Sequence, residues 1–180
     1  MMKQFGFGLM FILGILLSSS CKKVQKLTQF DMDYSSQVVI PSSTGINLPF
    51  SIGTPDISTN SESEFALNDT RKDLIEKITL KSLKLTISNP SSGNFDFLNS
   101  AEIYIKAEGL DPLLMASKYN IQDGIGNELT LEVSGSDFKE YIKKDKFSLE
   151  VKSVSDKLIT QDYTLNVAAV FFVDAKILGL

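Results

Sequence analysis

Apolar and polar residues alternate along most of the chain from Gln29 onward. Successive side chains of a β-strand point to opposite faces of a sheet, so an alternating stretch has one face suited to a core and one suited to water. The clearest case is Ile78–Ser88, in which Leu83, Leu85 and Ile87 share one face. This pattern favours antiparallel sheets, because parallel sheets are buried on both faces and their strands are continuously apolar.

Similar stretches follow one another, separated by residues that favour turns. The polar stretch Ile57–Leu67 is expected at the edge of a sheet, where Glu62 and Glu64 would discourage pairing with another chain. Together the sequence predicts strands at 29–40, Asn47–Thr54, Ile57–Leu67, Ile78–Ser88, Ala101–Ala107, Glu128–Val133, Phe147–Val154 and Gln161–Val173.

Three short helical segments are expected among the connections. Thr70 can cap the first, Pro112 suits the first position of the second, and Asp137 with Glu140 has the spacing of a capping box for the third. Their expected bounds are Asp73–Ile75, Asp111–Tyr119 and Asp137–Lys144.

Seven or eight short strands with regularly spaced turn signals indicate an all-β fold. We predict an antiparallel, Ig-like β-sandwich with two or three short connecting helices, folded as a single domain over residues 29–180. The stretch SLKLTISNP at Ser82–Pro90 resembles a strand signature of the late-embryogenesis-abundant type 2 family. This resemblance covers nine residues; it implies an Ig-like sandwich and no enzymatic role.

The first 20 residues have the organisation of a secretion signal. Lys3 is followed by an apolar or glycine run of 13 residues, Phe5–Leu17. As a helix this run spans about 20 Å, less than the ~30 Å hydrocarbon core of a bilayer, so it suits a cleaved signal better than a permanent span. Three serines and the only cysteine of the chain, Cys21, come next.

An apolar run that ends in small residues and a cysteine resembles the lipobox of bacterial lipoproteins. In that family the cysteine receives a diacylglyceryl group, the signal is cut just before it, and the new amino group is usually acylated. The resemblance implies a removed signal over residues 1–20, lipidation of Cys21 and a tether over residues 21–28. Ser18 stands where the family prefers Leu, Val or Ile, so cleavage after Ser20 by an ordinary signal peptidase is the alternative.

The tether contains Lys22, Lys23 and Lys26. These lysines either contact anionic headgroups, at about 1 kcal/mol each near the surface, or are merely solvated. The chain as a whole is similar to small outer-membrane lipoproteins of Bacteroidota. In lipoprotein sorting an Asp after the cysteine favours the inner membrane, and many surface-exposed lipoproteins have an acidic run there. Lys22 therefore implies the outer membrane, and the three lysines in place of an acidic run imply its periplasmic side rather than the cell surface.

The composition excludes several kinds of catalytic site. The chain has no histidine, which rules out Ser-His-Asp and Cys-His systems and histidine zinc sites. With Cys21 lipidated, no thiol would remain for catalysis, metal binding or a disulfide. Removal of residues 1–20 would lower the net charge from −4 to −5, and an acidic chain without a basic patch argues against nucleic acid. We therefore expect no enzymatic activity, no cofactor and no metal ion.

Paired carboxylates are the remaining candidates for hydrolysis. The pairs are Asp31 with Asp33, Glu62 with Glu64, and Asp96 with Glu102. The first two pairs alternate with other residues as on the solvated face of a strand, and we expect them to be structural. The stretch DGIGNE at 123–128 has oxygen ligands suited to a hard cation but lacks the EF-hand spacing, and it suits a turn equally well.

The last predicted strand departs from alternation. From Val167 to Val173 both faces are apolar, whereas an exposed sheet face would alternate throughout. We therefore expect the outer side near Val170 and Phe172 to be covered. The cover is one of the short helices, the 94–99 loop, a partner protein or an apolar ligand.

These features favour a non-catalytic, lipid-anchored envelope protein that acts as an accessory or binding subunit of an outer-membrane protein assembly. One alternative is a carrier that holds a lipid or another small apolar molecule between its sheets. The other is a carboxylate-dependent hydrolase.

Overall fold

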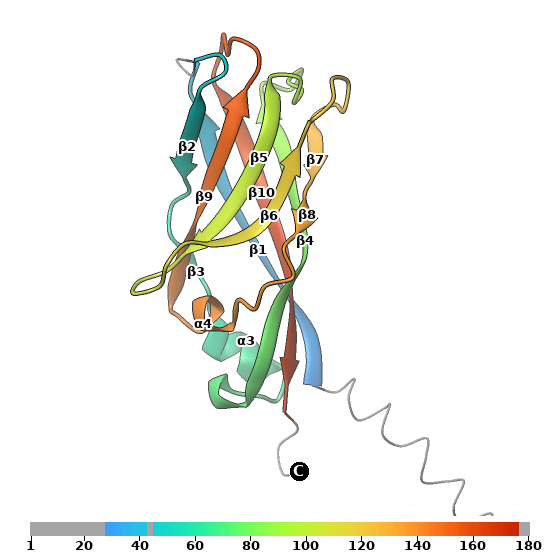
Figure 1. Ribbon diagram of the computed structural model, residues 1–180. Coiled ribbons are helices and arrows are strands. Elements are labelled where there is room, and N and C mark those ends of the chain that lie inside the picture. The colour runs from blue at the N-terminus through green and yellow to red at the C-terminus, as the bar shows by residue number, and fades with distance from the viewer. Residues whose placement is uncertain (1–27, 43–44, 177–180) are drawn as a thin grey trace, which may run out of the picture.

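A computed structural model describes residues 28–42 and 45–176 as two antiparallel sheets that face one another in a β-sandwich (Figure 1). The four-stranded sheet has the order β1 (Gln29–Ile40), β10 (Tyr163–Ala175), β4 (Ile75–Asn89) and β7 (Glu128–Thr130). The six-stranded sheet has the order β2 (Pro49–Gly53), β9 (Lys146–Ser155), β5 (Leu98–Lys106), β6 (Leu113–Tyr119) and β8 (Glu132–Val133), and β3 (Ile57–Ser58) also pairs with β9. The predicted all-β antiparallel sandwich is therefore confirmed.

The alternating sequence places one face of each long strand in the core. In β4, Leu83 and Leu85 are fully buried while Lys84 between them is exposed. The inner faces of both sheets contribute to one continuous apolar core. Across it, the rings of Phe147 in β9 and Phe171 in β10 pack edge to face with their centroids 6.5 Å apart. Such burial is the dominant stabilising term, at roughly 25 cal/mol per Å² of apolar surface.

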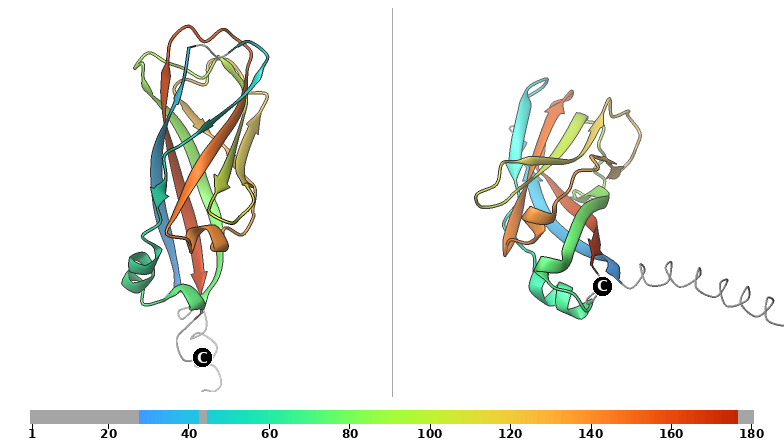
Figure 2. Two further views of the ribbon diagram at one scale, coloured as in Figure 1. Left: turned by 90° about the vertical axis from the view of Figure 1, so that its left-hand side faces the viewer. Right: turned by 60° about the horizontal axis from the view of Figure 1, so that its bottom comes forward.

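The two ends of the sandwich differ (Figures 1 and 2). One end, here named the helical end, carries α3 (Ser61–Leu67), the 3₁₀ helix η2 (Lys72–Leu74) and α4 (Lys139–Ile142). β1 begins and β10 ends there. The opposite end, here named the loop end, consists of the described residues in the connections between β1 and β2, β4 and β5, β6 and β7, and β9 and β10. Within the described ranges no helix is long and apolar enough to cross a membrane.

The prediction of one edge strand over Ile57–Leu67 is wrong. Only the first two residues pair with β9, and Ser61–Leu67 forms α3. Ser61 and Phe65 are both buried, and their spacing of four residues places them on one face of a helix. The acidic residues read as edge protection instead lie in the first turn of α3, where negative charge is favourable.

The prediction of a helix over Asp111–Tyr119 is also wrong, because Leu113–Tyr119 is strand β6, paired with β5. Leu113, Leu114 and Met115 are good helix formers, but the hairpin with β5 overrides their local preference. Gly109 has φ +74° in the turn that joins the two strands, and glycine adopts this conformation without steric cost.

Neither predicted helix cap forms as expected. Thr70 is buried after α3, its Oγ1 has no hydrogen-bond partner in the described structure, and η2 begins at Lys72 without a side-chain cap. Helix α4 is shorter than predicted and has no side-chain cap either. The Asp137 carboxylate instead accepts hydrogen bonds from the backbone N–H groups of Lys139 (3.0 Å) and of Ile78 in β4 (3.1 Å). It thus ties the α4 segment to the sheet.

The predicted strand Glu128–Val133 divides between the two sheets. β7 pairs with β4, and β8 pairs with β6. Between them, the backbone N–H of Leu131 donates to the carbonyl of Leu83. Seven of the described strands have five residues or more. Six of them coincide with the remaining predicted strands, and the seventh is β6.

Candidate functional site

The predicted lipidation site, Cys21, lies outside the described residues, as do the predicted signal and all of the tether except Thr28. The described chain enters the sandwich at the helical end, where β1 begins at Gln29 (Figure 1). The tether would therefore connect to this end of the molecule.

Val170 and Phe172 lie on the outer face of the four-stranded sheet, as predicted from the alternation in β10. Phe171 and Val173 point into the core and are fully buried, while Val170 and Phe172 are half-buried. Their neighbours on the adjacent strands are Asp33 and Asp31 of β1 and Ser82 and Thr79 of β4, directly opposite in the register. The two apolar side chains thus lie between an acidic strand and a hydroxyl-bearing one.

An ion pair spans the sheet beside these two side chains. Nζ of Lys81 in β4 lies 2.5 Å from Oδ2 of Asp31 in β1, and β10 runs between those two strands. A register shift between Val170 and Phe171 leaves Lys81 without a directly opposite residue, and such a bulge re-aims a side chain. The methylene stem of Lys81 therefore crosses the outer face of β10 and covers apolar surface, while its charge meets Asp31.

The ring contacts of the helices and of the 94–99 loop lie elsewhere. Phe138, just before α4, contacts Phe171 on the core side, with ring centroids 5.7 Å apart. Phe65 of α3 contacts Phe30, which packs against the core. Phe97 contacts Tyr163 at the loop end, at 4.4 Å. These ring contacts lie on the core side or at the ends of the sandwich, and the Lys81–Asp31 pair lies beside Val170 and Phe172 on the outer face.

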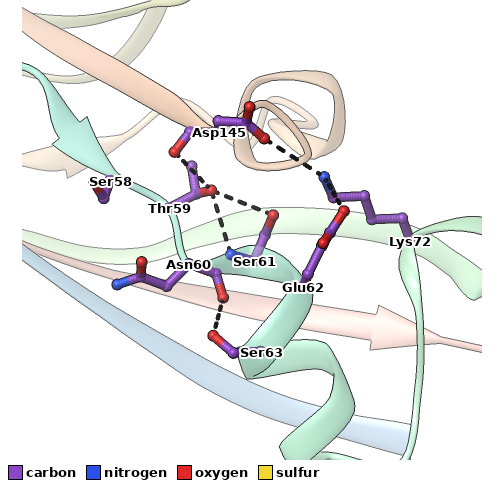
Figure 3. A pocket seen from close by; sticks show the side chains of 8 residues that line it. All are labelled: Ser58, Thr59, Asn60, Ser61, Glu62, Ser63, Lys72 and Asp145. Atoms are coloured by element: carbon purple, nitrogen blue, oxygen red, sulfur yellow. Dashed lines mark hydrogen bonds and ion pairs between the residues drawn. The ribbon is translucent and has the colours of Figure 1, made fainter.

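A polar pocket of about 350 Å³ lies beside α3 at the helical end (Figure 3). Lys72 contributes its only positive charge, with Nζ 3.2 Å from Oε1 of Glu62 and 4.0 Å from Oδ1 of Asp145. The lining residues are Ser58, Thr59, Asn60, Ser61, Glu62, Ser63, Lys72 and Asp145.

The hydroxyl groups of this pocket hold the local structure together. Oγ1 of Thr59 donates to the carbonyl of Lys144 (2.6 Å) and accepts from the backbone N–H of Ser61 (3.3 Å). Oγ of Ser63 donates to the carbonyl of Asn60 (2.8 Å), whose φ of 47° turns the chain from β3 into α3. The bonds drawn in Figure 3 therefore connect the residue after β3, helix α3 and the residue before β9, which is a structural role.

A second pocket, of about 280 Å³, shares Ser58–Asn60 with the first and brings together three of the predicted acidic residues, Asp31, Asp33 and Glu64. The Tyr34 hydroxyl beside them donates to the carbonyl of Thr59 at 2.7 Å. Burial, with the charge of Glu64, raises the pKa of Tyr34 far above its usual value. Within the described ranges no group of three or more His, Cys, Asp or Glu residues is arranged to hold a metal ion.

The third predicted pair, Asp96 with Glu102, is divided between two places. Oδ1 of Asp96 accepts from the backbone N–H of Gly124 at 2.7 Å. Glu102, on the outer face of the six-stranded sheet, accepts from the hydroxyls of Tyr104 (3.1 Å) and Tyr119. Each carboxylate thus has its own structural partners.

The DGIGNE stretch at 123–128 forms a turn at the loop end. Gly124 and Gly126 both have positive φ, 83° and 80°, and Oδ1 of Asp123 lies 2.7 Å from Nζ of Lys157. The Asp123 carboxylate, which a metal cation bound in this turn would need as a ligand, is thus paired with the Lys157 ammonium group.

The loop end also carries a surface that the sequence analysis missed. Eight large apolar side chains are exposed in the described part of the chain, and six belong to the loop-end connections or the strand ends beside them. These six are Val39, Ile46, Leu48, Tyr119, Ile125 and Leu158. The sequence feature that could have indicated this surface is the presence of apolar residues in turn-rich segments, such as Gly45-Ile46-Asn47-Leu48. No periodic pattern assigns these residues to a core.

No model of a known protein family matches the chain, and no curated protein matches it. Among solved structures, the decameric BFDV capsid protein aligns over 82% of this chain and 99% of its own, with a TM-score of 0.37 and 8% identity. A family 32 carbohydrate-binding module from C. perfringens NanJ, in complex with galactose, aligns over 81% of this chain and 96% of its own, with a TM-score of 0.31 and 14% identity. Desmodium yellow mottle tymovirus aligns over 84% of this chain and 91% of its own, with a TM-score of 0.28 and 12% identity. Likeness at this level assigns the chain to no family and transfers no function to it.

Proposed function

We propose that this chain is a non-catalytic, lipid-anchored protein of the bacterial cell envelope, which acts as a binding subunit of an outer-membrane protein assembly from the periplasmic side. The observation that carries the proposal is the place where the described chain enters the sandwich. β1 begins at Gln29 at the helical end (Figure 1), and eight residues, 21–28, precede it from Cys21 onward. Fully extended, eight residues reach at most about 28 Å, so a lipid on Cys21 would keep the helical end near the bilayer.

Attachment at one end leaves the remainder of the molecule to contact other proteins. Strand β10 has 13 residues, and at ~3.3 Å per residue it spans roughly 40 Å. An upright sandwich would present the loop end at about that distance from its attachment, and the sheet face with Val170 and Phe172 at the side. Both surfaces would face neighbours in the membrane assembly rather than the bilayer itself.

The interior offers no support for the alternative of an apolar ligand between the sheets. The ring of Phe171 contacts the rings of Phe138 and Phe147, and all three side chains are fully buried. The hydrolase alternative likewise gains little, because Asp31 of the acid-lined pocket is paired with Lys81. The absence of histidine from the sequence adds to the case for binding over catalysis.

The anchor is tested by expressing the full precursor in a bacterium that processes lipoproteins. The expected mature protein begins at Cys21, carries the added mass of the lipid and fractionates with membranes. Cys21→Ser should abolish the lipid mass and release the protein, while the neighbouring Ser19→Ala should leave both unchanged. A mature chain of unmodified mass that begins at Cys21 would contradict the proposal and favour ordinary signal peptidase cleavage.

The binding role is tested by purifying the lipidated protein from its own membranes in mild detergent. An outer-membrane protein should co-purify reproducibly, in fixed ratio. Phe172→Asp examines whether the sheet face takes part, with Ala168→Asp, an exposed position on the same face of β10, as the matched control. Repeated recovery of the protein alone would count against a binding subunit.

A further inference from the structure

The loop end has apolar side chains that the fold does not use. Leu48, just before β2, is 62% exposed, and Leu158, between β9 and β10, is 61% exposed; Ile46 is 46% exposed. The neighbouring Ile159 shows that this loop can bury an apolar residue, since it is 1% exposed. Exposed apolar side chains that share one part of a surface mark interaction sites, whereas single scattered ones are ordinary.

Hydrogen bonds hold the connections of the loop end together as one surface. The backbone N–H of Asn47 donates to the carbonyl of Ser155 at 2.7 Å, which fixes the segment of Leu48 against the end of β9. The backbone N–H of Asp156 donates to the carbonyl of Phe97 at 3.1 Å, which adds the β4–β5 connection. A surface ordered in advance loses little conformational freedom when it binds.

The charges of this surface are mostly negative. Its four connections contain one basic residue, Lys157, which pairs with Asp123 at 2.7 Å. The remaining acidic residues are Asp96, Asp156 and Asp162. Negative charge repels the anionic headgroups that attract basic segments to membranes, and electrostatic complementarity selects a partner of the opposite sign.

We infer that the loop end is a protein-docking surface, whose partner is an envelope protein that offers an apolar hollow flanked by lysine or arginine. The inference rests on the proposed function as a binding subunit and names the surface that binds. Leu48 and Leu158 enter the hollow, and the surrounding carboxylates meet the basic rim. The sheet face near Val170 and Phe172 is the lesser candidate, because the stem of Lys81 already lies over it and both side chains are half-buried.

Site-specific photo-crosslinking of the full-length protein in its native membrane tests this inference. A benzophenone amino acid replaces Leu48 or Leu158, and in the matched control it replaces Leu67, which is 78% exposed on α3 at the helical end. Positions 48 and 158 should yield adducts with the same envelope protein, and position 67 should not. The identified partner should contain an apolar hollow with basic side chains around it.

Two further variants show whether the adduct reports the proposed chemistry. When Leu158→Asp is combined with the benzophenone amino acid at position 48, the yield of the adduct should fall at least tenfold. Asp156→Lys should reduce it severalfold, and because both side chains are exposed, the melting temperature should not change. Adducts that survive both variants, adducts of lipid mass, equal adducts from position 67, or no protein adduct at all would each overturn the inference.

The outcomes also separate this inference from the proposed function. A soluble mature chain without lipid would overturn the anchor whatever the crosslinks show. An anchored chain whose partner is lost with Phe172→Asp, and retained with Leu158→Asp, would keep the binding role and place it on the sheet face.

Discussion

The two ends of the sandwich close the core in different ways. At the helical end, Phe65 of α3 and Phe138 beside α4 are fully buried, and each meets the ring of a strand residue. At the loop end, Phe97 is buried against Tyr163, yet Leu48 and Leu158 in nearby connections remain in solvent. The helical end therefore gives its large apolar residues mainly to the core, with Leu67 as the exception, whereas the loop end divides them between core and surface.

This difference separates stability from recognition along the molecule. Apolar burial stabilises the folded state in proportion to the area removed from water, so side chains that stay exposed add little. Substitutions at the helical end should therefore change the free energy of unfolding. Substitutions of the exposed leucines at the loop end should leave it unchanged and should alter binding.

Phe65→Ala is expected to have the largest effect on stability. The side chain is fully buried and packs against Phe30 at 6.3 Å between ring centroids, and removal of a buried Phe side chain costs about 3–5 kcal/mol. Urea denaturation followed by far-UV circular dichroism measures the change. Leu158→Ala is the loop-end control and should stay within about 0.5 kcal/mol of the wild type. A comparable loss for both variants would abolish the contrast between the ends.

Gly93→Ala tests whether the inner layer of the loop end is packed as tightly as the helical end. A Cβ at this position would lie 2.7 Å from Cγ2 of Ile87 and 3.0 Å from the carbonyl oxygen of Pro90. Overpacking of this kind costs about 1–3 kcal/mol, which thermal unfolding detects. Gly53→Ala is the control, because the nearest atom to its new Cβ would be the carbonyl oxygen of Leu149 at 3.9 Å. Equal melting temperatures for the two variants would show a loosely packed loop end.

The sequence predicted the long strands well for a physical reason. β1, β4, β9 and β10 each keep one face in the core and the other toward water, and this alternation is visible locally. The errors fell where local pattern and tertiary pairing disagree. Residues 113–119 favour a helix by composition but complete a hairpin with β5, and Ser61–Leu67 alternates in polarity but buries Ser61 and Phe65 on one helical face.

The candidate site was less accessible from the sequence. The outward direction of Val170 and Phe172 follows from alternation and was predicted correctly. The Lys81–Asp31 pair joins residues 50 positions apart across β10, so it depends on the strand order. The exposure of Leu48 and Leu158 depends on how four connections meet at the loop end, and irregular connections have no period from which burial can be inferred.

Tyr34→Phe sharpens the description of the helical end through its pH dependence. Loss of the hydrogen bond from Tyr34 to the carbonyl of Thr59 (2.7 Å) should cost about 1 kcal/mol at neutral pH. Because burial and Glu64 raise the folded-state pKa of Tyr34 above the unfolded value near 10, its protonated form stabilises the fold below pH 10. That contribution is lost as the pH rises further.

The wild type should therefore lose more stability between pH 9 and 11 than Tyr34→Phe, as measured by urea denaturation at each pH. Tyr104→Phe is the control. Its hydroxyl bonds Glu102 on the outer face of the sheet and is far less buried, and since desolvation and this hydrogen bond raise its pKa less than that of Tyr34, its profile should differ less from the wild type. Parallel pH profiles for the wild type and Tyr34→Phe would show that the Tyr34 hydroxyl is solvated.

The smallest effect is expected on the sheet face between the two ends, at the Lys81–Asp31 pair. The two side chains are 57% and 39% exposed, and exposed ion pairs contribute about 0–1 kcal/mol, less at high salt. Lys81→Met keeps the aliphatic stem over β10 and removes the charge, whereas Lys81→Ala removes both. If the stem matters more than the charge, Lys81→Ala should be the less stable of the two at both 50 mM and 1 M salt. A double-mutant cycle with Asp31→Asn measures the coupling energy between Lys81 and Asp31. A value above about 2 kcal/mol would show that this surface pair stabilises the fold, unlike the exposed side chains at either end.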